Sequence, residues 1–413
     1  MPKYIRHNSK EGSGITLIAL VITIIVLLIL AGISISMLSG DNSILKQAGK
    51  AKDKTQLSSL KEEAQIVMLN RVTEKTTSRR NIKTLKEDLE SGIINATVEN
   101  VNATDESEGL ADAYYVKKNG QYVTVYEDGD VEEGKIEIWD GKEISCPELK
   151  NEGNVWNWYI YKPSQLKFLA DFVNNGNKLD GREDLKKKVE DANYNISTVT
   201  MSTDTTIYLM SNLDLGARQK DGELIIGTSW TPIGTDLENV KGKLGTFEGN
   251  NFTIRGVYIN NEGTFQGLFG NSNSIKNLTI KNSYIKAKYL VGGIVGRLRN
   301  GNIENCHNIN TTVISTDEEL NSVGGIAGHS SKSNEIIKCS NSGRITGNGG
   351  NTYGGYAGGI VGYTQTSTRI TQCTNNGDIE GKGSEIGGIV GFLDVKRWNK
   401  FLWKYRKSKR RKQ

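Results

Sequence analysis

A five-residue unit, Gly-Gly-Ile-x-Gly, recurs four times in the C-terminal part of the chain and constrains the fold more than any other feature. Successive units are spaced by 32, 34 and 29 residues, and they begin at Gly292, Gly324, Gly358 and Gly387. A variant, Gly267-Leu268-Phe269-Gly270, precedes the first unit by 25 residues. Self-similarity at a period of about 20–50 residues is typical of solenoids, in which each repeat stacks on the next. We therefore predict a mainly β chain with a right-handed β-helix-like solenoid over residues 265–394.

A second pattern, Ile-x-x-Cys-x-Asn, follows each of the first three units, at Ile303–Asn308, Ile336–Asn341 and Ile370–Asn375. One repeat cannot bury its apolar face alone, so we expect these isoleucines to stack as one interior ladder. The isoleucines of the glycine units form a second ladder. Paired glycines would let backbone segments pass closely at a corner. These pairs are Gly292-Gly293, Gly324-Gly325, Gly358-Gly359 and Gly387-Gly388.

Three cysteines, Cys306, Cys339 and Cys373, occupy matched positions in the second pattern. They could bind a metal, form a disulfide between neighbouring coils, or pack as small apolar residues. The leading unit reads Ile275-x-x-Leu278 and so places leucine in the cysteine position. This favours packing. The whole chain has only 3 histidines, which argues against a histidine-rich metal site. We expect neither a metal nor another cofactor.

Together these residues resemble the GLUG repeat of bacterial surface proteins. The Gly267–Gly270 variant matches the core that names the motif, and the later units match its Gly-Gly-Ile-Val-Gly form. The resemblance implies a structural, non-catalytic part of a surface protein. Residues 149–264 are expected to form degenerate leading coils, with a helix from Pro163 that caps the open end of the solenoid.

An aromatic stretch opens this leading region, with Trp156, Trp158, Tyr159 and Tyr161. Such a cluster is either a platform on which sugars stack or part of the core. Core packing is the commoner role of aromatic clusters, and we favour it here.

The N-terminus carries an uncharged, mostly aliphatic segment from Ile15 to Gly40, long enough to span a bilayer as a helix. A short leader with Lys3, Arg6 and Lys10 precedes it and ends in Gly14. In an ordinary secretory signal the cleavage site follows the apolar run. Here the candidate junction precedes it, so we expect the apolar helix to stay on the mature protein.

The junction Ser13-Gly14-Ile15-Thr16 resembles that of the type IV prepilin and pseudopilin family. The resemblance implies that a prepilin peptidase cuts between Gly14 and Ile15 and methylates the new N-terminus. The fifth mature residue is Ala19, where the family usually carries Glu. This departure favours a minor pilin, a pseudopilin or a membrane-anchored protein over a bulk pilus subunit.

Residues 41–148 are predicted to form a pilin-like head. Apolar residues recur at helical spacing from Ile44 to Met68, and a shorter amphipathic stretch runs from Ile82 to Ile93. Strands are predicted over 113–116 and 122–126, joined by a turn at Asn119-Gly120, with a third over 136–139.

The formal charge of +5 is concentrated at the ends of the chain, because residues 396–413 contain ten Lys and Arg and no acid. The rest of the chain is acidic overall once the basic leader is also set aside, which argues against a nucleic-acid partner. The tail also breaks the repeat after residue 394. We interpret 395–413 as a frameshifted or truncated end; as a native tail it would bind anionic wall polymer or membrane.

These features favour an exported, single-pass protein of the cell membrane with its C-terminal domain outside the cell. Its expected partners are the prepilin peptidase, the membrane, other pilins or pseudopilins, and a surface glycan or wall polymer. The leading function is adhesion or surface display; the second is a minor pilin or pseudopilin of a secretion or pilus assembly. A polysaccharide-acting enzyme is third, because candidate carboxylates such as Asp378 and Glu380 do not recur in register.

Overall fold

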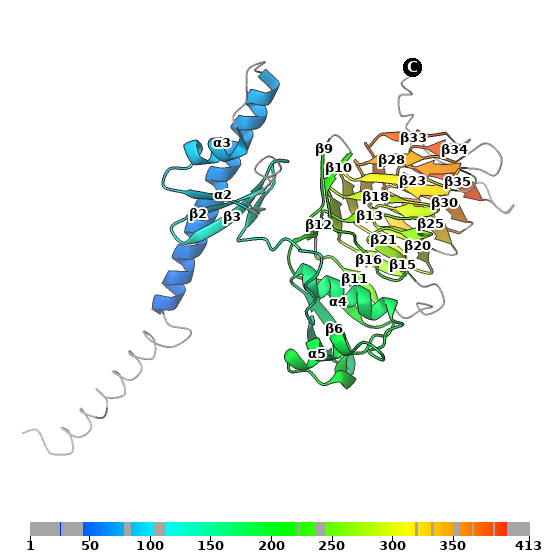
Figure 1. Cartoon of the computed structure of the whole chain (residues 1–413), viewed down its shortest axis with the longest axis horizontal. Coiled ribbons are helices and arrows are strands. Elements are labelled where there is room, and N and C mark those ends of the chain that lie inside the picture. Colours follow the sequence, from blue (N-terminus) through cyan, green and yellow to red (C-terminus); the bar gives the residue numbers. More distant parts are fainter. Residues whose placement is uncertain are drawn as a thin grey trace, which may run out of the picture. The chain divides into compact units, whose positions relative to one another are not determined.

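The computed structural model describes residues 25, 44–77, 84–101, 113–220, 223–235, 244–318, 321–331, 334–349, 355–365, 367–382 and 385–394. The chain divides into two compact units, Met1–Lys135 and Ile136–Gln413 (Figure 1). The expected leader (1–14), all but Ile25 of the expected membrane helix (15–40) and the basic tail (395–413) lie outside the described residues. None of the helices in the described part of the chain is both long and apolar enough to cross a bilayer.

The first unit packs two helices against a small antiparallel sheet, as the periodicity of the sequence predicts. Helix α2 spans Ile44–Thr77 and α3 spans Leu85–Gly92. The strand order is β1-β2-β3-β4, with bounds Thr97–Asn100, Ala113–Lys118, Gln121–Tyr126 and Val131–Glu133. One apolar core joins helix and sheet, and includes Leu60, Ala64, Leu89, Val116 and Val123. Thr84 and Glu87 form a capping box that starts α3.

The first unit ends earlier than predicted, at Lys135 rather than near residue 148. The strand expected over 136–139 does not join the sheet of this unit, where β4 pairs with β3 instead. Ile138 forms an isolated bridge to Asp214 in the second unit. Trp139 is buried there and packs edge-on against Trp230, with ring centroids 5.5 Å apart. The burial of this large aromatic side chain explains why the segment belongs to the second unit.

The second unit is a β-solenoid in which each complete coil contributes one strand to each of five parallel sheets. Figure 1 shows the coils stacked from green to red along the chain. The first coil is partial and contains β7 (Thr206–Leu209) and β8 (Leu213–Asp214), followed by the hairpin β9 (Arg218–Lys220) and β10 (Glu223–Ile226).

The complete coils follow in chain order, each with five strands. They are β11–β15 (Thr246–Glu248, Thr253–Arg255, Tyr258–Asn260, Phe265–Gln266, Phe269–Ser272), β16–β20 (Ser274–Lys276, Thr279–Lys281, Tyr284–Ala287, Leu290–Gly292, Val295–Arg299), β21–β25 (Asn302–Glu304, His307–Ile309, Thr312–Ser315, Asn321–Gly324, Ala327–Ser331), β26–β30 (Glu335–Ile337, Ser340–Asn341, Arg344–Gly347, Gly355–Gly358, Val361–Gln365) and β31–β35 (Arg369–Thr371, Thr374–Asn375, Ile379–Gly381, Glu385–Gly387, Val390–Asp394).

The interior of the solenoid is built from in-register ladders of apolar side chains. Ile303, Ile336 and Ile370 pair on successive strands, as predicted. The same ladder continues backward through Ile275 and Phe247. The second predicted ladder, at 294, 326, 360 and 389, is buried except at its last member, which lies in the final coil. Stacking therefore buries the apolar face of each coil.

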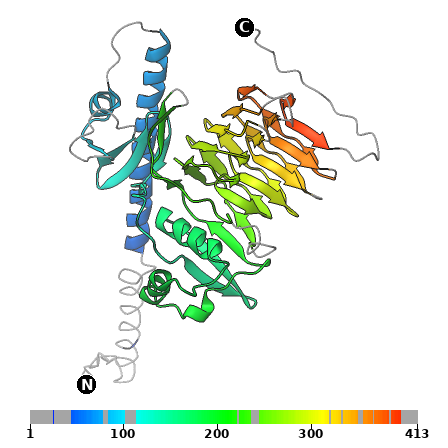
Figure 2. The same cartoon turned by 45° about the vertical axis from the view of Figure 1, so that its right-hand side comes forward.

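A cap precedes the coils and consists of β5 (Glu148–Glu152), β6 (Val155–Ile160), α4 (Pro163–Asn174) and α5 (Glu183–Asp191) (Figure 2). β6 pairs in parallel with β7 and so extends the first sheet beyond the first coil. Trp158 is fully buried against Phe168 and Phe172 of α4. Trp158 is therefore part of the core and Trp156 packs partly buried against it, whereas Tyr159 stacks on Tyr208 at 5.0 Å and Tyr161 is exposed.

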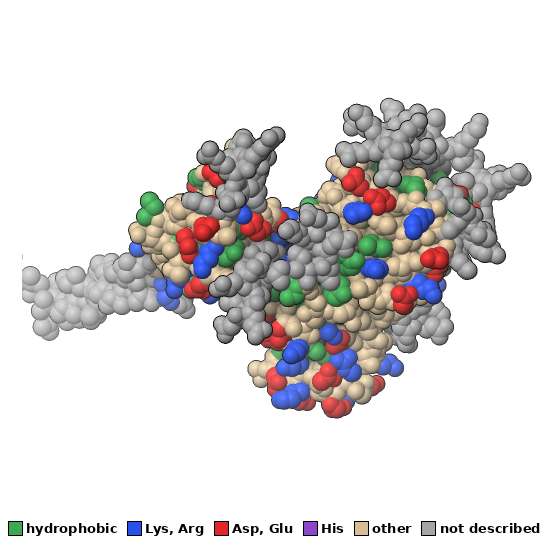
Figure 3. All heavy atoms as spheres, turned by 45° about the horizontal axis from the view of Figure 1, so that its top comes forward, with side chains coloured by type: hydrophobic (Ala, Val, Ile, Leu, Met, Phe, Trp, Pro, Cys, Tyr) green, Lys and Arg blue, Asp and Glu red, His purple; other side chains and the backbone are tan. Residues whose placement is uncertain are grey.

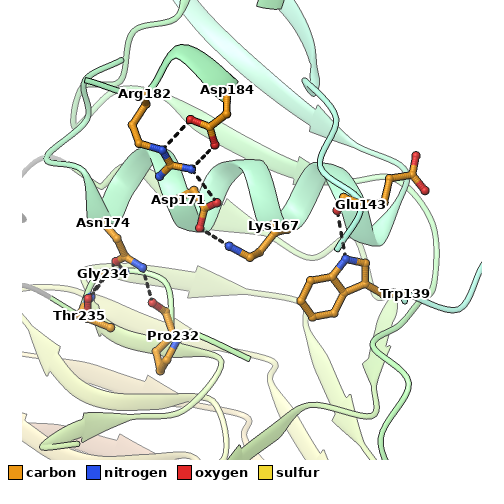
Figure 4. A network of polar contacts seen from close by, with 10 residues as sticks. All are labelled: Trp139, Glu143, Lys167, Asp171, Asn174, Arg182, Asp184, Pro232, Gly234 and Thr235. Carbon is orange, nitrogen blue, oxygen red and sulfur yellow. Dashed lines mark hydrogen bonds and ion pairs between the residues drawn. The ribbon is translucent and has the colours of Figure 1, made fainter. Parts of the chain in front are cut away.

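Polar contacts join α4 to the neighbouring backbone (Figure 4). Asn174 donates to the carbonyl of Pro232 at 2.9 Å and accepts from the backbone N–H of Gly234 at 2.8 Å. Asp171 pairs with both Lys167 and Arg182. These bonds satisfy polar groups at the helix end and fix the helix on the coil. Over the cap, Figure 3 shows basic and acidic side chains interspersed.

Candidate functional site

The paired glycines of the repeats lie where the fourth strand of a coil turns into the fifth. A Cβ atom on Gly293 would lie 2.3 Å from the carbonyl oxygen of Gly325, and one on Gly325 would lie 2.3 Å from that of Gly359. No side chain fits at such distances. Close approach between coils, rather than a left-handed backbone, therefore requires these glycines.

The left-handed residues of the repeat lie elsewhere, at the position directly before each cysteine. They are Asn305, Lys338 and Gln372, with φ of 51°, 56° and 55°. The sequence predicts turns at Asn310, Gly343 and Gly377, and only Asn310 among them has a positive φ. At Gly343 a Cβ would lie 2.2 Å from the carbonyl oxygen of Thr311, so close packing explains that glycine too.

The three repeat cysteines stack inside the solenoid with free thiols. Cys306 and Cys339 are buried, and Cys373 in the last coil is half-buried. Each Sγ lies near a carbonyl oxygen of the preceding coil, as for Cys339 and Ile303 at 3.7 Å. The hydrogen bond from Cys306, with burial, holds the pKa of the Cys339 thiol above its usual range. Among the described residues no cluster of His, Cys, Asp or Glu could hold a metal ion.

The asparagines of the second pattern form a buried polar ladder beside the cysteines. Asn308 donates to Asn341 at 2.8 Å, and Asn341 donates to Asn375 at 2.7 Å. On the same sheet the preceding coils place Ile254 and Ile280 at this position. The ladder thus changes from apolar to amide side chains where the regular repeats begin.

A row of polar, charged and aromatic side chains runs across the fifth sheet (β15-β20-β25-β30-β35), with one residue in each coil. We name it the outer row, and it consists of Asn271, Arg297, His329, Tyr363 and Phe392, which pair in register on successive strands. Phe265 and Tyr356 of the fourth sheet join it. Tyr356 stacks on Phe392 at 4.9 Å, and Arg297 lies over the ring of Phe265 at 5.9 Å.

The outer row changes in chemistry along the solenoid. Arg297 has no acidic partner in the part of the chain that the structure describes. Burial, together with the charge of Arg297, lowers the pKa of His329 to about 4, so the imidazole is neutral at pH 7. At the other end the hydroxyl of Tyr363 donates to Asp394 at 3.1 Å. Burial, followed by this carboxylate, raises the pKa of Tyr363.

The position of the outer row can be found in the sequence, although the residue type at that position differs from one repeat to the next. Each of Arg297, His329, Tyr363 and Phe392 directly follows the last glycine of a Gly-Gly-Ile-x-Gly unit, and Asn271 directly follows the Gly267–Gly270 variant. The position is constant while the residue type varies. Solenoids bind through extended surfaces that run across successive repeats, and the outer row runs across the repeats in this way.

The paired glycines at the turn between the fourth and fifth strands, which we call the glycine corners, and the Ile-x-x-Cys-x-Asn pattern together define the repeat. Residues 288–314 and 353–380 match the GLUG motif. Each match includes the last two strands of one coil and the first two and part of the third of the next, so the GLUG motif is out of phase with the coil. No curated protein matches the sequence.

One solved structure is similar to this chain. It is a candidate immunoglobulin A1 protease from Bacteroides ovatus, with 17% sequence identity and a TM-score of 0.35. The similarity covers 57% of this chain and 71% of that one. A similarity of this degree assigns no activity to the present chain.

Proposed function

We propose that the protein is exported through its prepilin-like N-terminus, stays anchored in the membrane, and displays the GLUG solenoid outside the cell to bind a polymer. Three features support this. The apolar segment 15–40 precedes helix α2 in the sequence. The solenoid matches the GLUG motif, and the resemblance of its repeats implies a surface protein. The outer row crosses several coils on one face.

The outer row is the observation that carries the proposal. Strands of neighbouring coils lie about 4.8 Å apart, so the row offers a series of contacts along the solenoid axis. Tyr356, Tyr363 and Phe392 form one aromatic cluster with centroids 4.9 to 5.7 Å apart. Amphipathic rings combine contact area with hydrogen-bonding tips, which suits sugar units. An extended glycan lying along the row would contact several coils at once.

We propose a binding rather than a catalytic role for this face. Hydrolysis of glycosidic bonds ordinarily needs a pair of carboxylates on opposite sides of the bond. Beside the outer row the carboxylate of Asp394 accepts a hydrogen bond from the hydroxyl of Tyr363, and binding needs no pair of carboxylates.

The test is binding of the purified full chain to a panel of soluble polysaccharides. Phe392→Ala removes a ring of the cluster and is expected to weaken binding by about tenfold, in line with 1–2 kcal/mol for an aromatic contact. Tyr258→Ala is the matched control, because Tyr258 pairs with Tyr284 on another sheet. Equal losses in both variants, or no binding by the wild type, would contradict the proposal.

A second candidate function is a minor pilin or pseudopilin, and the first unit favours it. Its 34-residue helix α2 packs along an antiparallel sheet and begins just after the apolar segment. This is the arrangement that a pilin-like head requires. Co-purification of the chain with pilus or secretion filaments tests this candidate, whereas a chain found only in dispersed membrane complexes would exclude it.

A further inference from the structure

Three adjacent members of the outer row share an unusual property. Asn271 Oδ1, Arg297 Nε and His329 Nε2 are buried polar atoms without a hydrogen-bond partner. The three residues pair in register on successive coils. We name them the polar segment of the outer row.

Buried polar atoms in folded proteins nearly always have partners, and leaving them unpaired is unfavourable. The orientation of Asn271 is fixed, because its amide donates to the carbonyl of Gly234 at 3.0 Å. Its free oxygen is buried and out of reach of an external polymer, so it makes the site polar from behind without a direct contact. Arg297 and His329 are half-buried, so the exposed parts of a guanidinium and of a neutral imidazole on successive coils are what the polar segment offers to a ligand.

The positive charge of the polar segment favours a ligand with an anionic group. Arg297 and its neighbour Arg299 are both cationic, whereas Glu385 and Asp394, the carboxylates that together with burial raise the pKa of Tyr356, lie in the last coil. An anionic group is therefore favoured at Arg297 and disfavoured at the far end of the row. Arginine also matches the planar geometry of a carboxylate.

We propose, building on the glycan-binding function above, that the polar segment binds the carboxylate and a hydroxyl of a uronate unit in an acidic polysaccharide. The next, neutral sugar unit then lies toward Tyr363 and Phe392. Arg297 and Tyr363 are two coils apart, or about 10 Å, so one monosaccharide cannot contact both. The ligand is a polymer in which charged and neutral units alternate.

The experiment measures binding of hyaluronate, whose uronate and neutral units alternate, by titration calorimetry with the full chain. Two probes serve as ligand controls: carboxyl-reduced hyaluronate, which lacks the charge, and polygalacturonate, which is charged at every unit. We expect each to bind at least about tenfold more weakly than hyaluronate, the effect of one lost charge-assisted contact.

Arg297→Gln is expected to weaken hyaluronate binding by the same factor. Arg344→Gln is the matched control, since Arg344 lies on another sheet and pairs with Glu380 in an exposed ion pair. Arg297→Lys keeps the charge and is expected to bind with intermediate affinity, which separates lost charge from lost folding.

The outcomes distinguish this inference from the proposed function. If Arg297→Gln binds like the wild type, or if carboxyl-reduced hyaluronate binds as tightly as hyaluronate, the acidic ligand is wrong. If polygalacturonate binds as tightly as hyaluronate, the alternation of charged and neutral units is wrong. If Phe392→Ala still weakens binding of another glycan by about tenfold in either case, the proposed glycan-binding function stands. If no glycan binds, both are wrong.

Discussion

The imidazole of His329 and the phenol ring of Tyr363, in register on neighbouring coils, meet edge to face with ring centroids 5.0 Å apart. The imidazole is thereby held in a half-buried position beside the cation Arg297, and this environment lowers the pKa of His329 to about 4. The charge state of His329 consequently links the outer row to the stability of the solenoid.

We predict that the solenoid loses stability as the pH falls from 7 to 5. The ordinary pKa of His329 is 6.5, so below that pH the unfolded chain binds a proton that the folded chain excludes. The loss from this residue is on the order of 1–2 kcal/mol. Urea denaturation followed by tryptophan fluorescence measures it. His329→Gln should have a smaller pH dependence, to which His307, whose pKa burial also lowers, still contributes.

The glycine corners give a second prediction. Gly325→Ala places a methyl group 2.3 Å from the carbonyl oxygen of Gly359, so the coils must separate locally. We expect a loss of about 2 kcal/mol or more in the free energy of unfolding of the solenoid. Gly49→Ala in α2 is the contrast, because nothing lies within 4 Å of its added Cβ. That change should stabilise the helix by up to about 1 kcal/mol, measured by far-UV circular dichroism.

The cysteine ladder gives a third prediction. Cys339 is 1% exposed, so Cys339→Val should cost no more than about 1.5 kcal/mol, as for near-isosteric core changes. Cys339→Asp places an unpaired charge in the interior and should prevent folding of the coil. Thermal unfolding of both variants checks this. Equal tolerance of the two changes would mean that the side chain faces solvent.

The interior of the solenoid was predictable because stacking requires the same residue type at the same position in every coil. The isoleucines and cysteines at 303, 306, 336 and 339 meet this requirement. The long helix α2 was predictable for a similar reason, since its buried residues recur at helical spacing.

Other features depend on the geometry of the stacked coils and could not be predicted from residue type. Lys338 and Gln372 adopt the left-handed conformation that favours glycine and asparagine, because the geometry of the stacked coils imposes it. The outer row shares a position but not a residue type, so it becomes visible only when the strands are aligned. The end of the first unit depends on where Trp139 is buried, which is a matter of tertiary packing.

The central claim is that the chain is anchored by a processed N-terminus and carries its solenoid outside the cell. Mass spectrometry of the fragment that stays in the membrane after protease treatment of intact cells tests it most directly. The predicted fragment begins at methylated Ile15, after cleavage at Gly14, and lacks the peptides of residues 265–394. A fragment that begins at Met1 or after residue 30, or a full-length chain that resists the protease until the cells are lysed, would contradict it.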